Sequence, residues 1–433
     1  MPQPCLPARD PNEAHRASTP FELLFDLISV IAIAAVTHGL AHAIAAGHGL
    51  AVLPNFLFLF VAVWWAWMNF TWFASAFDND GFAYRLLVMV VMTGELIFAG
   101  GAGYIFETLD FSYGVWGWAL MRLGMAALWL SAAQNPDYRT TCLRYAAGIV
   151  IAQILWIALW YFVAPGSGTF LALGCLIWLV EFAVPMVAEA KRPTPFHRHH
   201  IIERYGLLTI IAMGEIMLAI SHGFGRMFED HAALAPALTA LAALVLTFAV
   251  FWIYFSAEEH LKSRDFPTVF LWGYGHVVIF AAIAALGAGI TAEIDLAGRA
   301  HAPAAIEAPA HGAPAAEGHA APEGHEAPAP EGHAAPAPET HAAPVESHGA
   351  EHAPASAAWF LGGPLAVLFL GLWAVRDRLY PLGLRGPALP VMALVALAAA
   401  ALGLPSWAFA AIAALALIWR VPLPGRAPAP MSH

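Results

Sequence analysis

Long apolar runs alternate with short polar connections along almost the whole chain. A helix needs about 20 apolar residues to cross the hydrocarbon core of a bilayer, and most of these runs come close to that length. The pattern predicts an all-α polytopic integral membrane protein with about twelve transmembrane helices. The predicted spans are residues 21–44, 54–74, 85–107, 111–132, 142–164, 168–190, 203–224, 236–257, 268–292, 357–375, 388–404 and 405–420, of which the last two are short.

Composition agrees with this class of protein. Of the 433 residues, 60% are hydrophobic and only 11% are charged, whereas soluble domains contain about a quarter of charged residues. The lipid bilayer is therefore an expected partner. The net charge of −11 comes largely from eight glutamates in one low-complexity segment, so it does not indicate an acidic surface on the rest of the chain. We expect no nucleic-acid partner. The three cysteines, Cys5, Cys142 and Cys175, are too few and too widely spaced to predict a disulfide framework.

The distribution of basic residues predicts the topology. The N-terminus, the even-numbered connections and the C-terminus carry sixteen Lys and Arg residues, and the odd-numbered connections carry only Arg226 and Arg299. Connections rich in Lys and Arg stay in the cytoplasm. We therefore expect residues 1–20 and 421–433 to be cytoplasmic, around a membrane core of about nine spans over residues 21–293 and further spans over residues 357–420.

One long connection, residues 294–356, is rich in His, Ala, Pro and Glu and has no apolar period. It cannot bury a core, so we expect it to be disordered and, by the topology, to lie outside the cytoplasm. Imidazole binds zinc, nickel and copper, which makes the segment a candidate metal-binding loop. A solvated Ala-Pro spacer is the alternative. The candidate ligands are His311, His319, His325, His333, His341, His348 and His352, with His301 at the start of the same series.

Ionisable residues within the apolar runs are the main candidates for function. A charge at the bilayer centre costs about 2.5–3.5 kcal/mol on insertion scales, so such residues face a bundle interior or a wet cavity. Glu22 and Asp26 share one face of the first span with Ser29 and Thr37. The predicted proton or cation pathway comprises Glu22, Asp26, Glu95, Arg122, Glu181, Glu215, His222 and His276.

Two other interpretations of these residues are open. In the first, Arg122 neutralises Glu95 or Glu181 in a buried ion pair that only orders the bundle. In the second, the intramembrane ionisable residues form a catalytic site. Arg204 falls at the predicted start of the seventh span, where we expect an interfacial anchor.

Aromatic residues are concentrated in the second span. Trp65, Asn69 and Trp72 share one helix face by their spacing of four and three residues. They predict one wall of an apolar ligand pocket, and ordinary helix packing is the alternative.

A weak internal similarity relates the two halves of the chain. The first span begins with Glu22 and ends with His38-Gly39, and the seventh begins with Glu203 and ends with His222-Gly223. Six spans separate them, so two parallel six-helix repeats are expected, as in several transporter folds.

Several sequence blocks resemble the bacterial low temperature requirement protein A (LtrA) family. They include Thr19-Pro20-Phe21-Glu22-Leu23-Leu24-Phe25-Asp26-Leu27, the block from Trp64 to Phe73, Phe77-Asp78-Asn79-Asp80, and the stretch from His200 to Glu215. The likeness extends from about residue 16 to the end of the membrane region and skips the His-rich loop. It implies a multi-span bacterial inner-membrane protein and supplies no agreed biochemical activity.

These observations favour a proton- or cation-coupled transporter-like protein that uses intramembrane carboxylates. A membrane-embedded enzyme or binding protein for a lipid-soluble ligand is the first alternative, and a non-catalytic protein of cold growth or envelope homeostasis is the second. The sequence contains no nucleophile elbow, Walker loop or dinucleotide fingerprint, which disfavours the familiar enzyme classes.

Overall fold

A computed structural model describes residues 6–13, 16–229, 234–256, 266–299, 353–379 and 382–421. Its described residues form twelve α-helices and two short 3-10 helices, and eleven apolar helical segments are long enough to cross a membrane. The prediction of an all-α polytopic membrane protein is confirmed, and its helices contact the lipid bilayer. The α-helices are α1 (Pro20–Ala45), α2 (Gly49–Ala76), α3 (Phe82–Thr108), α4 (Ser112–Ala132), α5 (Arg139–Phe162), α6 (Gly168–Glu189), α7 (Arg198–Glu229), α8 (Leu234–Phe255), α9 (Phe266–Arg299), α10 (Ala353–Val375), α11 (Ala388–Ala401) and α12 (Ser406–Arg420).

Several helices extend beyond the predicted spans. Helix α7 begins at Arg198 and not at residue 203, and α9 continues to Arg299, past the predicted start of the long connection at residue 294. Backbone hydrogen bonding can continue outside the hydrocarbon layer, where side chains no longer need to be apolar. Helix α12 has only 15 residues. The candidate metal ligands from His311 to His352 lie outside the described residues, so metal binding there stays a prediction.

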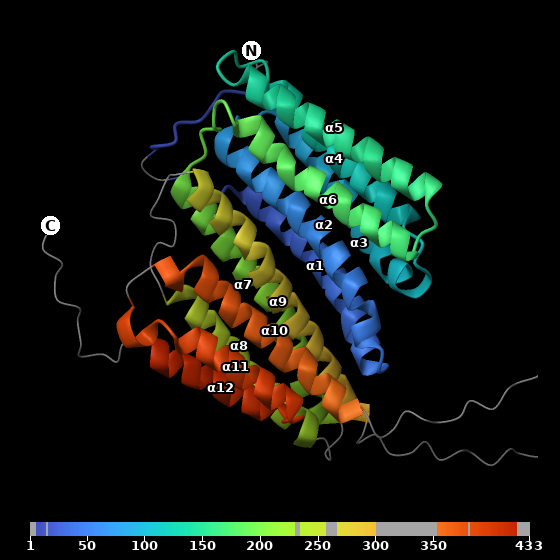
Figure 1. The fold of residues 1–433 in the computed structure, drawn as a ribbon, viewed down its shortest axis with the longest axis vertical. Coiled ribbons are helices and arrows are strands. Elements are labelled where there is room, and N and C mark those ends of the chain that lie inside the picture. The colour runs from blue at the N-terminus through green and yellow to red at the C-terminus, as the bar shows by residue number, and fades with distance from the viewer. Residues whose placement is uncertain are drawn as a thin grey trace, which may run out of the picture.

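The helices form two groups that meet along α1, α7 and α9 (Figure 1). In the first group, α1 packs against α2 and α3, and α3 to α6 follow one another. In the second, α7 packs against α8 and α9, and α9 to α12 follow one another. The order of these pairings is the same in both groups, but in the second group α12 also packs closely against α8. Short connections between antiparallel helices can produce that order without any repeat, so the two-repeat arrangement stays a prediction.

The Thr-Pro-Phe-Glu block fixes the start of α1. Thr19 Oγ1 accepts a hydrogen bond from the Glu22 backbone N–H (3.2 Å), and Glu22 Oε2 accepts one from the Thr19 N–H (2.8 Å). This is a capping box, with Pro20 at the first helical position. The motif therefore sets the first turn of α1 and holds the Glu22 carboxylate at that turn.

Candidate functional site

A line of buried polar residues follows one face of α1. Glu22, Asp26 and Ser29 are all enclosed by neighbouring helices. Their spacing of four and three residues places them on one side of the helix. The structure thus brings together three residues that the sequence placed on a common face.

Asp26 forms a buried ion pair with Arg204 of α7. Arg204 donates from Nη2 to Asp26 Oδ1 at 2.5 Å and from Nε to Oδ2 at 3.1 Å. Trp67 of α2 also donates to Oδ1, at 2.6 Å. Such two-point Arg–carboxylate contacts are among the strongest hydrogen-bonded pairs. The charge of Asp26 is therefore compensated within the bundle.

Glu22 lies among three cationic or potentially cationic side chains. Its Oε1 is 3.3 Å from Arg16 Nη2, 3.0 Å from His200 Nε2 and 3.5 Å from Arg204 Nη1. Arg16 is itself fixed by the Ser75 and Ala74 carbonyls at the end of α2, at 2.6 and 2.8 Å. This network joins the N-terminal segment, α1, α2 and α7 at one end of the bundle.

Asp78 extends the network into the connection between α2 and α3. Its Oδ2 is 3.4 Å from Arg9 and 3.9 Å from Arg16. Desolvation by burial raises the pKa of Asp78, against the lowering effect of these guanidinium groups. The N-terminal segment is thus held against the connection by charge pairs.

Glu95 of α3 differs from the other buried carboxylates. Its side chain is fully buried, and Ser29 Oγ of α1 lies 3.1 Å from each carboxylate oxygen. No Lys, Arg or His in the described ranges forms an ion pair with it. Glu95 is therefore a carboxyl group inside the bundle whose direct partner is a neutral hydroxyl.

A second buried charge cluster lies on the other side of α2. Arg122 of α4 pairs with Glu181 of α6, which also accepts hydrogen bonds from Trp65 (3.1 Å) and Trp156 (3.3 Å). The Arg122 guanidinium carbon is 5.0 Å from the centre of the Trp118 ring. Of the two partners considered for Arg122, the structure places it against Glu181 and not against Glu95.

The remaining predicted pathway residues lie apart from these clusters. Glu215 is partly exposed, and its Oε1 is 3.9 Å from His38 Nδ1 beside a cavity of about 10 Å³. His222 is exposed on α7. His276 is buried among aromatic rings, with Nδ1 2.7 Å from the Trp272 carbonyl oxygen.

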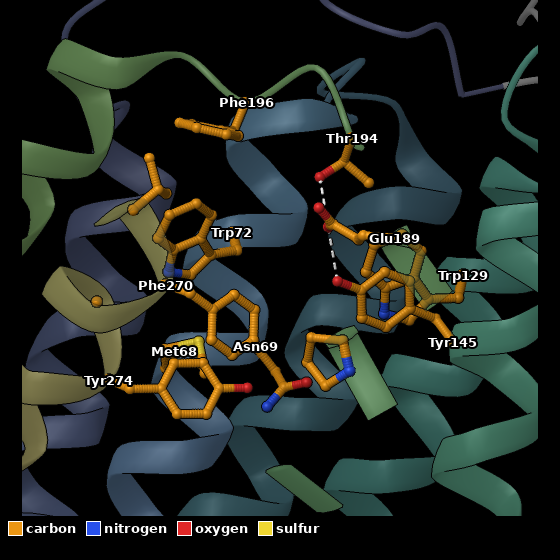
Figure 2. Close-up of a pocket in the computed structure, with 13 residues that line it drawn as sticks. Met68, Asn69, Trp72, Trp129, Tyr145, Glu189, Thr194, Phe196, Phe270 and Tyr274 are labelled. Atoms are coloured by element: carbon orange, nitrogen blue, oxygen red, sulfur yellow. Dashed lines mark hydrogen bonds between the residues drawn. The ribbon is translucent and has the colours of Figure 1, made fainter. Parts of the chain in front are cut away.

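An aromatic pocket opens between α2, α4, α5, α6 and α9 (Figure 2). Its α2 residues, Met68, Asn69 and Trp72, lie towards the C-terminal end of that helix. The pocket has a volume of about 40 Å³. Three aromatic pairs form its walls: Trp129 with Tyr145, Phe270 with Tyr274, and Trp72 with Phe196. Glu189 is the one carboxylate in its lining.

The family model described as "Bacterial low temperature requirement A protein (LtrA)" matches residues 17–321, which is well over half of the chain. This chain belongs to the LtrA family. It is also 25% identical over 299 residues to an uncharacterized protein, RA0937, of Rhizobium meliloti (strain 1021), covering 64% of this chain and 69% of the relative. No solved structure matches.

The LtrA match covers the capping box, the α1 polar line and the Arg122–Glu181 pair. It stops before α10, so the predicted extension of the likeness to the end of the membrane region goes beyond the matched residues. The α10–α12 part of this LtrA-family chain is described by the structure alone.

The predicted ligand wall divides between two places in the LtrA-family bundle. Asn69 and Trp72 line the aromatic pocket. Trp65 points to the neighbouring charge cluster, where its indole N–H bonds Glu181. Its ring also lies 5.5 Å from Tyr274, so it supports the pocket wall from behind.

The sequence interpretation of Arg204 as an interfacial anchor was wrong. Because α7 begins at Arg198, residue 204 lies more than one turn inside the helix, where it is buried against Asp26. The sequence contains an indication of this contact. His200 and Arg204 are four residues apart and share a helix face, as Glu22 and Asp26 do on α1, so the two faces can pair.

The sequence interpretation also missed a cluster that secures the last helices. Asp377 accepts hydrogen bonds from Arg376 (2.7 Å) and from Arg420 at the end of α12 (2.8 Å). Arg376 in turn donates to the Ile253 and Tyr254 carbonyls of α8, at 3.1 and 2.8 Å. In the sequence, Arg376 and Arg420 indicate only the topology, but both side chains are buried.

Proposed function

We propose that this LtrA-family chain is a proton-coupled, transporter-like protein of the bacterial inner membrane, with Glu95 as its proton-binding group. The observation that carries the proposal is the burial of Glu95 against the Ser29 hydroxyl without a cationic partner among the described residues. Asp26 and Glu181, by contrast, are each bonded to an arginine.

The chemistry of the Glu95 site favours a proton over a metal cation. A hard metal cation takes several oxygen ligands, about six or more for calcium and magnesium. Glu95 and Ser29 supply one carboxyl and one hydroxyl group. A carboxyl group in the bundle interior is stable when it is protonated, and it can release the proton when water reaches it.

The polar groups along α1 support a route to this site from one side. Ser29 is three residues from Asp26, and Glu22, His200 and Arg16 continue the line towards the end of the bundle. By the predicted topology this is the cytoplasmic end.

Further along α1, apolar residues interrupt the polar line. Val30 and Ile33 border a small cavity between α1, α7 and α9 with Glu215 and Thr37. Thr37 and Glu215 also border the next cavity, together with His38. Polar groups on both sides of an apolar stretch suit a transporter that admits water from one side at a time, and do not suit an open channel.

A second candidate function, binding of a small ligand, is favoured by the aromatic pocket at the end of α2. It corresponds to the binding-protein alternative and does not require turnover.

Proton flux into proteoliposomes tests the transport proposal. Wild-type protein should acidify liposomes that contain a pH-sensitive dye when an inside-negative potential is imposed, and Glu95→Gln should reduce the flux to that of empty liposomes. Glu107→Gln, which changes an exposed carboxylate on the same helix, is the matched control. Equal flux through wild type and Glu95→Gln, or no protein-dependent flux, would count against the proposal.

A further inference from the structure

We infer that the aromatic pocket binds a small alkylammonium cation, with Glu189 as its counter-charge (Figure 2).

The walls present paired aromatic rings on different sides. Trp129 and Tyr145 are stacked with centroids 3.9 Å apart, and Phe270 and Tyr274 are stacked at 4.2 Å. Trp72 and Phe196 meet edge to face at 4.9 Å. Several aromatic rings around one space attract cations through their negative faces, and quaternary ammonium groups are the cations typically bound in this way.

Glu189, half-buried at the end of α6, places a carboxyl group beside this apolar space, and a cation bound there favours the ionised form of that group. Its Oε1 accepts hydrogen bonds from the Tyr145 hydroxyl at 2.7 Å and from Thr194 Oγ1 at 2.8 Å, which Figure 2 draws as dashed lines. Both donors are neutral. They hold the carboxyl group in place without supplying a positive charge. The ionised carboxylate can therefore attract a bound cation.

Basic side chains around Glu189 do not pair with it in the part of the chain that the structure describes: Lys191 is exposed, and Arg192 and Arg144 contact other groups. Arg192 contacts Asp137 at 3.4 Å and lies 4.5 Å from the Tyr138 ring, and Arg144 donates to the Val187 carbonyl. Within the described ranges, Glu189 has no ion pair. The Glu189 carboxylate would repel an anionic ligand. A neutral apolar ligand would displace water from the carboxylate without compensating the negative charge of Glu189.

The volume limits the ligand to a few heavy atoms. A cavity of about 40 Å³ holds roughly three water molecules, at about 10–15 Å³ each. A methylated ammonium group fits that size. The Asn69 side chain, which donates to the Trp65 carbonyl at 2.7 Å, adds a fixed polar group to the lining.

This inference does not rest on the proposed proton coupling. Glu189 and Glu95 lie on different helices, and neither contacts the other's partners. Failure of one proposal leaves the other standing.

Binding of tetramethylammonium chloride to the purified full-length protein, followed by titration calorimetry and by the change in total tryptophan fluorescence, tests the inference. Glu189→Gln should weaken binding about tenfold or more, because it removes the counter-charge and keeps the side-chain shape. Phe270→Leu should weaken it about threefold to tenfold, because it removes one aromatic face and keeps an apolar side chain. Glu107→Gln should bind as wild type does.

tert-Butanol, a neutral molecule of similar size, should neither bind nor compete. Thermal melts of each variant report whether it is folded, and Phe270→Leu keeps the test decisive if Glu189→Gln unfolds. Equal affinity of wild type and Glu189→Gln, unchanged affinity in Phe270→Leu, competition by tert-butanol, or no binding to wild type at millimolar concentration would overturn the inference.

Discussion

Asp26 and Glu95 are both buried carboxylates beside α1, yet their surroundings give them different roles. Asp26 is held by two hydrogen bonds from Arg204 and one from Trp67. Glu95 contacts the Ser29 hydroxyl. Removing one member of a buried ion pair costs about 3–5 kcal/mol because a charge is left uncompensated. Replacing a protonated carboxyl with an amide leaves no such charge.

Asp26→Asn should therefore lower the free energy of unfolding by about 3 kcal/mol, because Arg204 then loses its main partner. Arg204→Gln should do the same. The double variant should lose less than the sum of the two single changes. Denaturant unfolding in detergent measures each loss, with the exposed Asp137→Asn as control. Strictly additive losses would contradict the pairing.

The sequence identified the buried carboxylates more readily than their partners. Glu95 and Glu181 stand out because a charge within an apolar run is costly and therefore rare. Their partners depend on the rotation of each helix and on where it begins, which the apolar pattern does not specify. Arg204 illustrates this, because an earlier start of α7 converts an expected surface residue into a buried one.

At the scale of helices, α3 and α4 pack through glycine. A Cβ atom added to Gly117 would lie 2.7 Å from the Phe98 backbone nitrogen and 2.8 Å from the Gly94 carbonyl oxygen. Small residues let transmembrane helices approach closely. This contact positions α3, and with it Glu95, against the rest of the bundle.

Gly117→Ala should destabilise the protein by about 1–3 kcal/mol, because the added methyl group meets backbone atoms that cannot move away independently. Gly100→Ala is the matched control, since no atom lies within 4 Å of its added Cβ. Thermal unfolding of both variants tests this packing. A Gly117→Ala protein as stable as the control would show that the two helices are not so close.

The pattern of apolar runs predicted the number of helices well, since that number follows from length and hydropathy. It did not predict which contacts hold the short helix α12 against the rest of the bundle. The cluster of Arg376, Asp377 and Arg420 joins the ends of α8, α10 and α12. The contacts between these helix ends join residues 43 to 123 positions apart in the chain, which meet only after folding, so no local sequence pattern predicts them.

At the scale of the whole molecule, the ends of α9 and α10 that flank residues 300–352 lie at the opposite end of the bundle from the start of α1 (Figure 1). This arrangement accords with the sidedness predicted from Lys and Arg. Reporter fusions after residues 195 and 430 should therefore report the cytoplasm, and fusions within residues 300–350 should report the outside. A cytoplasmic report from residues 300–350 would contradict the predicted topology.

Infrared spectroscopy of Glu95 tests the central claim of proton binding most directly. Wild-type protein in lipid nanodiscs at neutral pH should show the carbonyl band of a protonated carboxylic acid, and this band should shift in deuterium oxide. Glu95→Gln, with unchanged thermal stability, should lack the band, whereas Glu107→Gln should retain it. The same carboxylic-acid spectrum in wild type and in a folded Glu95→Gln variant would contradict the assignment of the proton to Glu95.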